Sequence, residues 1–579
     1  MKHFKYLGVV LALCIASLCL AQTSPAAPNV SSTSYRIFGI VVDLLSNQPI
    51  AGARVIIVSV TERGAPRIVK SGADGRFLFE NLPRGKYSLG ADHRGYPEQG
   101  YDQHEGFATA IAVGPDLDSE HIIFRLRPGC MLRGTVTNDE NEPVQGASVR
   151  LFKASIENGR SSTHVVGFKM TDDRGYYSFP HLTEGNYYVA ASGQPWYATN
   201  PSYVEQARVQ GTDPETVARL EAEGSQVNLV YPMTFYPGTE SSEEAASIHV
   251  GPGESATADL LLHAVRPLRI HISGPPPVIE TATGEPSDAR GGITFYTGRS
   301  RRVLQMPQVR ATQMVFGEPM DVSAGLGGTG IPGEFEVLGI TPGRYSITVT
   351  NTGEAGTTAS TQELDITGDM ELSPTGGNAS SNVAGVLSSN SPPQTELIIR
   401  LSAKDRRRSY ATRIVDGKFK FDGPVPPGAY EVVVGGPSND AYIKTFSATG
   451  AKVSGRTIQI VAGQPVQLSI TMGQGMTRID GIATKDGKPF AGAMILLVPV
   501  DFENNSLLTR RDQSDSDGTF TLGPIVPGKY KVVAIQNGWT TSWADPKTIQ
   551  PYLKNIAEVE VTGAATTMNV KVQVQPLLK

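Results

Sequence analysis

Residues 518–530 read GTFTLGPIVPGKY, and this stretch contains the pattern that decides the fold. A Gly-x-aromatic triplet, Gly518-Thr519-Phe520, is followed ten residues later by Gly528-Lys529-Tyr530. The same pair of triplets occurs four more times, beginning at Gly75 and Gly85, Gly175 and Gly185, Gly333 and Gly343, and Gly417 and Gly428. Such regular spacing predicts a tandem array of about five small all-β modules rather than one large domain.

The first repeat shows how each module is built. Strands are predicted over 37–42 and 53–58, and Asp74-Gly75 is a turn in which the Asp side chain bonds the backbone and Gly takes a positive φ. Arg76–Phe79 then alternates aromatic and polar residues, and Tyr87–Leu89 returns through the core. Many short strands without a long helix predict antiparallel β-sandwiches of the prealbumin-like or immunoglobulin-like kind.

The tyrosine of the second triplet occupies the same place in all five repeats. This placement resembles a tyrosine corner, in which the ring lies in the core and the hydroxyl bonds nearby backbone. We therefore expect a structural role for these five residues, which are Tyr87, Tyr187, Tyr345, Tyr430 and Tyr530.

Three phrases of the first repeat, at 49–55, 74–77 and 82–87, together resemble the carboxypeptidase regulatory-like domain, a transthyretin-like β-sandwich with a carbohydrate-binding-like fold. Repeats two and five share the Pro-x-x-Gly-Ala phrase, at 143–149 and 489–495, whereas repeats three and four lack it and are divergent. The resemblance implies an exported bacterial repeat protein. It implies no catalysis, because in that family the module accompanies the peptidase and is not the catalyst.

The repeats divide the chain into a signal peptide, a leader and five modules. The predicted ranges are 1–21 for the signal peptide, 22–34 for a flexible leader, and 35–128, 129–265, 266–373, 374–475 and 476–579 for modules one to five. Module two is the longest, and Asp213-Pro214-Glu215 predicts a short helix in a loop that leaves its sandwich. The short connections between modules predict a semi-rigid rod.

The N-terminus predicts export. Lys2 and Lys5 precede an apolar run over 7–20, and Ala21 offers a small residue for cleavage before Gln22. The run is shorter than the roughly 20 residues that span a bilayer, so we expect no transmembrane span in the mature chain. The predicted location is the periplasm, the cell surface or the surrounding medium.

Composition narrows the class of partner. The formal charge of −5 becomes −7 without Lys2 and Lys5, and a mildly acidic chain without basic clusters is a poor ligand for nucleic acid. After cleavage Cys130 is the remaining cysteine, so no intramolecular disulfide can form. We expect Cys130 to be a buried structural thiol.

Motifs that could carry chemistry are weak. His181-Leu182-Thr183-Glu184 matches a zinc-ligand pattern but falls in the turn before Tyr187, and Asp515-Ser516-Asp517-Gly518 begins like a calcium loop but lacks the closing Glu. Both are interpreted as turns. We predict no catalytic residue, no metal ligand and no cofactor.

Aromatic residues form the one suggestive set. Nine residues after the corner tyrosine, modules one, two and five have Tyr96, Trp196 and Trp539, and Trp543 follows nearby. Flat rings on loops can stack on sugars, but we favour the interpretation that these rings cap the end of a sandwich and pack against the following segment. The sequence therefore favours an exported, non-enzymatic scaffold or interaction protein of the cell envelope or extracellular space. The alternative is a carbohydrate-binding protein that uses these four rings; the partner would be an unidentified protein or polysaccharide at the cell surface.

Overall fold

The structure is a computed structural model. It describes residues 34–61, 64–198, 213–225, 227–273, 278–280, 292–297, 300–305, 308–322, 325–328, 334–353, 356–373, 378–389, 397–404, 408–436, 441–563 and 567–578. The predicted signal peptide and all of the leader except Ser34 lie outside these residues. We keep the names module one to module five for the predicted ranges.

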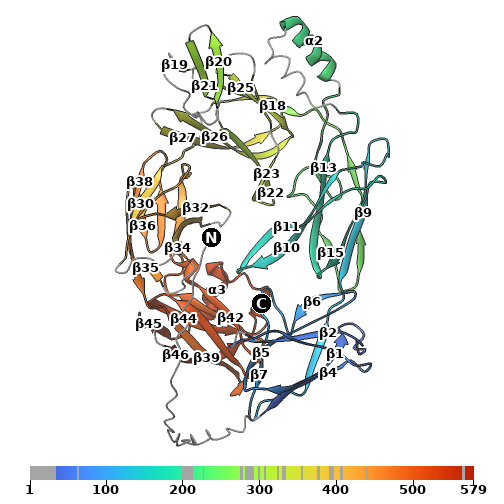
Figure 1. The fold of residues 1–579 in the computed structure, drawn as a ribbon, viewed down its shortest axis with the longest axis vertical. Helices are drawn as coiled ribbons and strands as arrows, with labels where there is room; N and C mark the ends of the chain where they lie inside the picture. The colour runs from blue at the N-terminus through green and yellow to red at the C-terminus, as the bar shows by residue number, and fades with distance from the viewer. Residues whose placement is uncertain are drawn as a thin grey trace, which may run out of the picture.

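Module one is a sandwich of two sheets (Figure 1). The first sheet has the order β4–β1–β8, formed by β1 (Tyr35–Asp43), β4 (Arg76–Leu82) and β8 (Ile122–Leu126). The second has the order β3–β2–β5–β6 with β7 also on β5, formed by β2 (Arg54–Ser59), β3 (Arg67–Lys70), β5 (Gly85–His93), β6 (Tyr96–Gly100) and β7 (Ile111–Val113). Thus the Gly-x-aromatic triplet begins a strand of one sheet, and the Gly-x-Tyr triplet begins a strand of the other.

The other modules repeat this plan, except that in module five the parallel pairing of the last strand with the Gly-x-Tyr strand joins the two layers into one eight-stranded sheet. The strands of module two are β9 (Cys130–Asn138), β10 (Ser148–Glu157), β11 (Arg160–Met170), β12 (Tyr176–Leu182), β13 (Gly185–Gly193), β14 (Tyr231–Phe235), β15 (Ile248–Val250), β16 (Ser255–Thr257) and β17 (Leu260–Leu262). Those of module three are β18 (Leu268–Ser273), β19 (Val278–Glu280), β20 (Gly292–Thr297), β21 (Ser300–Gln305), β22 (Gln308–Val315), β23 (Glu318–Asp321), β24 (Gly325–Gly328), β25 (Glu334–Ile340), β26 (Gly343–Gly353), β27 (Gly356–Ile366) and β28 (Met370–Leu372), with β29 (Asn378–Ala379) paired to β27. Those of module four are β30 (Val383–Ser388), β31 (Leu397–Ala403), β32 (Ser409–Ile414), β33 (Lys418–Lys420), β34 (Gly428–Gly435), β35 (Ala441–Thr449), β36 (Ala451–Ser454), β37 (Thr457–Ile460) and β38 (Val466–Gln474). Those of module five are β39 (Thr477–Lys485), β40 (Lys488–Pro489), β41 (Met494–Pro499), β42 (Arg510–Gln513), β43 (Thr519–Ile525), β44 (Gly528–Ile535), β45 (Glu558–Val561) and β46 (Thr567–Gln575).

One pairing departs from a purely antiparallel sandwich, although the all-β tandem fold is confirmed. In module one β1 pairs antiparallel with β4 and parallel with β8. The same parallel pairing joins the first strand to the last in the other modules, as β9 with β16 and β17, β18 with β28, β30 with β38 and β39 with β46. Parallel neighbours need a long crossover, and here the rest of the module supplies it.

Each module has a hydrophobic core of its own, and the corner tyrosine lies in it. These tyrosines are among the most deeply buried large side chains of the chain. The hydroxyl of Tyr87 donates to the Pro83 carbonyl at 3.0 Å, Tyr430 to Pro426 at 2.9 Å and Tyr530 to Val526 at 2.7 Å. Tyr187 bonds the Thr183 carbonyl, and the Tyr345 hydroxyl lies 3.0 Å from Thr341 Oγ1. The tyrosine-corner prediction is therefore confirmed at all five positions.

A glycine in the first strand makes room for the aromatic residue of the first triplet. Gly39 lies opposite Phe77 in the ladder, and the same pairing recurs for Gly134 with Tyr177, Gly385 with Phe419 and Gly481 with Phe520. A Cβ on Gly385 would lie 2.5 Å from Phe419 Cζ, so a larger residue cannot be accommodated without displacing the ring. The aromatic ring on one strand thus fills the space left by the glycine, which has no side chain, on the neighbouring strand.

Among the described residues, two α-helices interrupt the sandwiches. The predicted helix is present as α2 (Pro214–Ser225), and the backbone N–H of Thr216 donates to Asp213 Oδ1 at 2.8 Å. A second helix, α3 (Pro546–Leu553), follows β44 and was not predicted, although Asp545-Pro546 carries the same start signal and Asp545 caps it. Within the described residues, no helix is long and apolar enough to cross a membrane.

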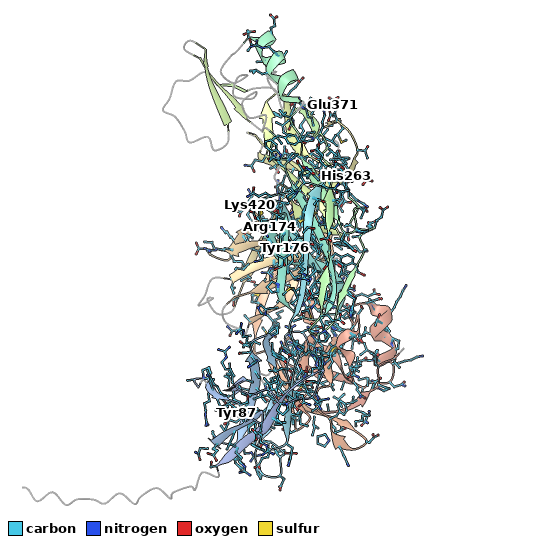
Figure 2. All side chains as sticks on the ribbon, turned by 90° about the vertical axis from the view of Figure 1, so that its right-hand side faces the viewer. Tyr87, Arg174, Tyr176, His263, Glu371 and Lys420 are labelled. Atoms are coloured by element: carbon cyan, nitrogen blue, oxygen red, sulfur yellow. The ribbon has the colours of Figure 1, made fainter. Side chains whose placement is uncertain are left out.

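The modules do not form a rod. The chain turns back so that module one, blue in Figure 1, lies beside module five, red in the same view. Figure 2, where Tyr87 marks module one, shows the same two modules side by side from a direction turned by 90°. The rod prediction is wrong because it considered the short connections between neighbours and not the loops that join the two ends of the array.

Replacing Gly385 with Ala should lower the free energy of unfolding of module four by about 3 kcal/mol, because the new methyl overpacks the core against Phe419. Urea unfolding of the full chain checks this. Gly423→Ala is the matched control, since a Cβ there meets no atom within 4 Å. Equal unfolding curves for the two variants would contradict the steric role of Gly385.

Candidate functional site: the contact between modules one and five

A tight loop of module one makes the contact. It lies between β6 and β7, and its tip is held by two backbone hydrogen bonds between His104 and Phe107, of 2.8 and 2.9 Å. Glu105 takes a left-handed conformation, with φ of 52°, which closes this small hairpin. The loop places His104, Glu105 and Phe107 against β42 and the short 3-10 helix Gly538–Thr540 of module five.

The centre of the contact is aromatic. The His104 and Trp539 rings are stacked, with centroids 5.4 Å apart and an interplanar angle of 7°. The Phe107 ring centroid also lies 5.4 Å from that of Trp539. The indole is only 6 % exposed, so it contributes a large buried apolar area to the junction.

Arg511 connects this aromatic cluster to a carboxylate. Its guanidinium lies 4.8 Å from the centroid of the Phe107 ring and 5.6 Å from those of Trp539 and Trp543. It also bonds both oxygens of Glu105, at 2.8 and 2.7 Å. A two-point arginine–carboxylate pair that also stacks on rings fixes the orientation of the two modules as well as their proximity.

Further polar contacts surround the centre. The Lys86 ammonium pairs with Asp515, which also accepts a 3.0 Å hydrogen bond from the backbone N–H of Ala110 through its other oxygen. The Gln513 side chain donates to the Asp102 carbonyl and to Thr109 Oγ1, both at 2.7 Å. These groups lie about 400 residues apart in sequence, and most of their hydrogen-bonding capacity is used within the contact.

Burial changes the titration of two carboxyl groups here. It raises the pKa of Asp512 to about 6, although the backbone N–H of Thr521 donates to that carboxylate at 2.7 Å. Burial also raises the pKa of Asp515, and the bond with Lys86 only partly opposes this. Both pKa values rise because water is excluded from this part of the junction, which disfavours the charged carboxylates.

Module two also reaches module five. The turn between β10 and β11 lays Gly159 directly against the Trp543 ring, and the Gly159 carbonyl accepts a 3.0 Å hydrogen bond from the backbone N–H of Ala544. Trp543 is only 5 % exposed, because this contact adds to its packing in a cluster of module five that includes Ile549 and Tyr552. Elsewhere Phe316 of module three packs on Phe152 and Phe235 of module two, which gives that junction an aromatic centre as well.

The structure places the four candidate rings in different surroundings. Trp539 and Trp543 are covered by modules one and two, as described above. Tyr96 is half-buried, and its hydroxyl donates to Asp43 at 3.0 Å. Trp196 differs from all of these, because its indole is 89 % exposed and meets Tyr197 edge-on.

The remaining candidate residues lie in turns, in the contact with module one or in the buried core. Asp517 caps its turn by accepting from the backbone N–H of Thr519 at 3.0 Å, while Asp515 serves the contact with module one. His181 has a left-handed backbone in the turn before Tyr187. Cys130 is buried, as expected, and its thiol donates to the Gly251 carbonyl. The described residues contain no group of three or more His, Cys, Asp or Glu placed to hold a metal ion.

Sequence reasoning identified Trp539 through its offset from the corner tyrosine but missed the loop that covers it. Arg511, Glu105 and His104 belong to no motif. The length of the segment after the Gly-x-Tyr strand is no signal of such a loop, since it covers 94–110 between β5 and β7 in module one and 436–456 between β34 and β37 in module four.

One family model matches part of the chain. The model of the carboxypeptidase regulatory-like domain matches residues 36–119 and 131–220, so modules one and two are such domains within a β-sandwich repeat protein. No curated protein matches the chain. Similar solved structures include the minor pilin GBS52 of Streptococcus agalactiae (11 % identity, 40 % of this chain and 96 % of that chain, TM-score 0.21) and the shaft pilin SpaA of Lactobacillus rhamnosus GG (8 %, 40 % and 98 %, 0.18). The Bacillus anthracis TIE protein is also similar (12 % identity, 93 % of this chain and 68 % of that chain, TM-score 0.15).

Replacing Arg511 with Ala should open the contact between modules one and five, because it removes both bonds to Glu105 and the stacking on three rings. We expect the contact between modules one and five to be less stable by about 3 kcal/mol. The radius of gyration should therefore increase in small-angle X-ray scattering. Arg478→Ala is the control, since Arg478 is exposed and pairs with Asp480 beside it. An unchanged scattering profile for Arg511→Ala would contradict the assigned role.

Proposed function

We propose that this protein is an exported, non-enzymatic scaffold and interaction protein of the cell envelope or extracellular space. Its five sandwiches present surfaces in a fixed arrangement. The partner is a protein or a polysaccharide at the cell surface.

One observation carries the proposal: polar residues that could serve chemistry are engaged in holding modules and junctions together. Asp74 and Asp172 accept backbone bonds in their turns, from Arg76 at 3.1 Å and Arg174 at 2.9 Å. The raised-pKa carboxyl groups lie in the junction of modules one and five, where Lys86 and backbone N–H groups bind them. Perturbed carboxyl groups in such a setting fit a structural ion-pair network better than a general acid or base.

The proposal of export rests on the sequence of residues 1–21, with its basic start, apolar run and small residue at 21. The acidic mature chain is consistent with partners other than nucleic acid.

A second candidate function is carbohydrate binding through Trp196. The observation that favours it is the 89 % exposure of this indole, since an apolar ring of that size is usually covered and a pyranose face could cover it.

Export predicts a defined mature N-terminus. When the full precursor is produced in a Gram-negative host, the periplasmic or secreted product should begin at Gln22 by mass spectrometry. Ala21→Leu removes the small residue before the cleavage position and should leave uncleaved precursor in the membrane fraction, while Ala26→Leu, within the leader, should be processed normally. A wild-type product that retains residues 1–21 would contradict export through this segment.

Carbohydrate binding predicts retention on an insoluble polysaccharide such as cellulose, xylan or peptidoglycan. Trp196→Ala should then reduce retention by about tenfold, the loss expected for one stacked ring. Tyr176→Ala, an exposed aromatic on the other sheet of the same module, is the matched control. If the wild-type chain is not retained, or if Trp196→Ala is retained equally, this second function is rejected.

A further inference from the structure

The ladder register identifies one surface that modules two and five share. In module five Met494 pairs with Gln513 of β42 and with Ile535 of β44, and Trp539 lies four residues beyond Ile535. In module two Ser148 pairs with Met170 of β11 and with Ser192 of β13, and Trp196 lies four residues beyond Ser192. Trp196 and Trp539 therefore occupy equivalent positions at the same end of equivalent sheets.

In module five this surface is occupied. The loop of module one covers it, with His104 and Phe107 on Trp539 and Glu105 on Arg511. The surface thus accepts a polypeptide hairpin that presents two rings and one carboxylate.

In module two no segment among the described residues packs over the equivalent surface in the way that the loop of module one covers Trp539. Phe168 takes the place of Arg511 in the register, because it pairs with Arg150 as Arg511 pairs with Leu496. Phe168 and Met170 are each 54 % exposed, and Trp196 is more exposed still. Aromatic and methionine side chains grouped around an arginine are the composition of a protein-binding hot spot.

The cation of this surface is Arg150, which forms no ion pair with a carboxylate among the described residues. Arg150 lies 5.9 Å from the centroid of the Phe168 ring and donates to Ser192 Oγ at 3.2 Å. Arg150 and Phe168 again place a guanidinium beside an aromatic ring on this surface, although in module five the guanidinium is Arg511 of β42 and Leu496 occupies the position of Arg150. An acidic group on an incoming loop would complete the arrangement.

We propose that the surface formed by Arg150, Phe168, Met170 and Trp196 binds a protein that presents an acidic, aromatic hairpin loop of the kind found at Tyr101–Thr109. This rests on the proposed scaffold function and names the partner class of one of its surfaces. A polypeptide is favoured over a saccharide because the equivalent surface in this chain is covered by polypeptide, and because three apolar side chains surround a single polar group, which leaves few partners for sugar hydroxyls.

The test uses the mature full chain and a backbone-cyclised peptide with the sequence of Tyr101–Thr109. Tryptophan emission is a selective reporter, because Trp539 and Trp543 are already buried and Trp196 is not. The peptide should shift the emission to shorter wavelength and protect it from iodide, with saturation below about 1 mM. The peptide carrying Glu105→Gln should bind several-fold more weakly.

The double variant Phe168→Ser/Met170→Ser keeps the reporter and should lose binding by about tenfold or more. Ile68→Ser is the matched control, because Ile68 is 56 % exposed on β3, the equivalent edge strand of module one. Unfolding curves equal to wild type show that the variants are folded, and Arg150→Gln gives an independent variant if the double one is not.

The proposal is overturned if the peptide leaves Trp196 emission unchanged up to about 1 mM, or if the double variant binds it as wild type does. It is also overturned if xylo- or cello-oligosaccharides protect Trp196 and the peptide does not, which would assign the surface to a sugar. Failure of export processing with intact peptide binding would reject the envelope function and leave this surface standing.

Discussion

The parallel pairing of the first and last strands of each module determines how the array is built. Because β1 and β8 run in the same direction, the chain comes into the sandwich at one end and leaves at the other. The next module can then begin at once, as when β9 begins at Cys130 after β8 ends at Leu126. The buried tyrosine and the facing glycine and aromatic ring hold the two sheets around this pair. The strand order alone would therefore produce a linear array of modules. The contact between modules one and five must be made by other segments of the chain.

The contact between the two ends of the array is made by loops that follow the Gly-x-Tyr strand and leave the sandwiches. The hairpin around Glu105 and the segment around Trp539 arise at the same topological position in modules one and five, and they meet across the array. The turn at Gly159 joins module two to the same place. The modules keep separate cores, so the arrangement depends on a few aromatic rings and charge pairs whose individual contributions are each a few kcal/mol at most.

Features that depend on residues close together in the sequence could be predicted, whereas contacts between residues far apart in the sequence could not. The corner tyrosines, the Asp-Gly turns and the α2 start are encoded by residues within a few positions of one another, and all were predicted. The helix α3 carried the same local signal at Asp545-Pro546 and was overlooked. The contact of Glu105 with Arg511 joins positions about 400 residues apart that match no motif, and Phe107 from that contact completes a cluster of module five in which Trp539 is buried. No local pattern in the sequence indicates that these segments meet.

The strand plan also has a mechanical consequence. A pull on the two ends of module one draws β1 and β8 along their own axes in opposite directions, so the hydrogen bonds between Gly39–Asp43 and Ile122–Leu126 are loaded in shear. Bonds loaded in this way must break together, whereas a hairpin pulled open at one end loses them singly. Resistance to tension is then governed by the rate of forced rupture and not by the equilibrium stability of the module. The five modules share this pairing and follow one another along the chain, so a pull on both ends would load them in series once the contact between modules one and five has opened.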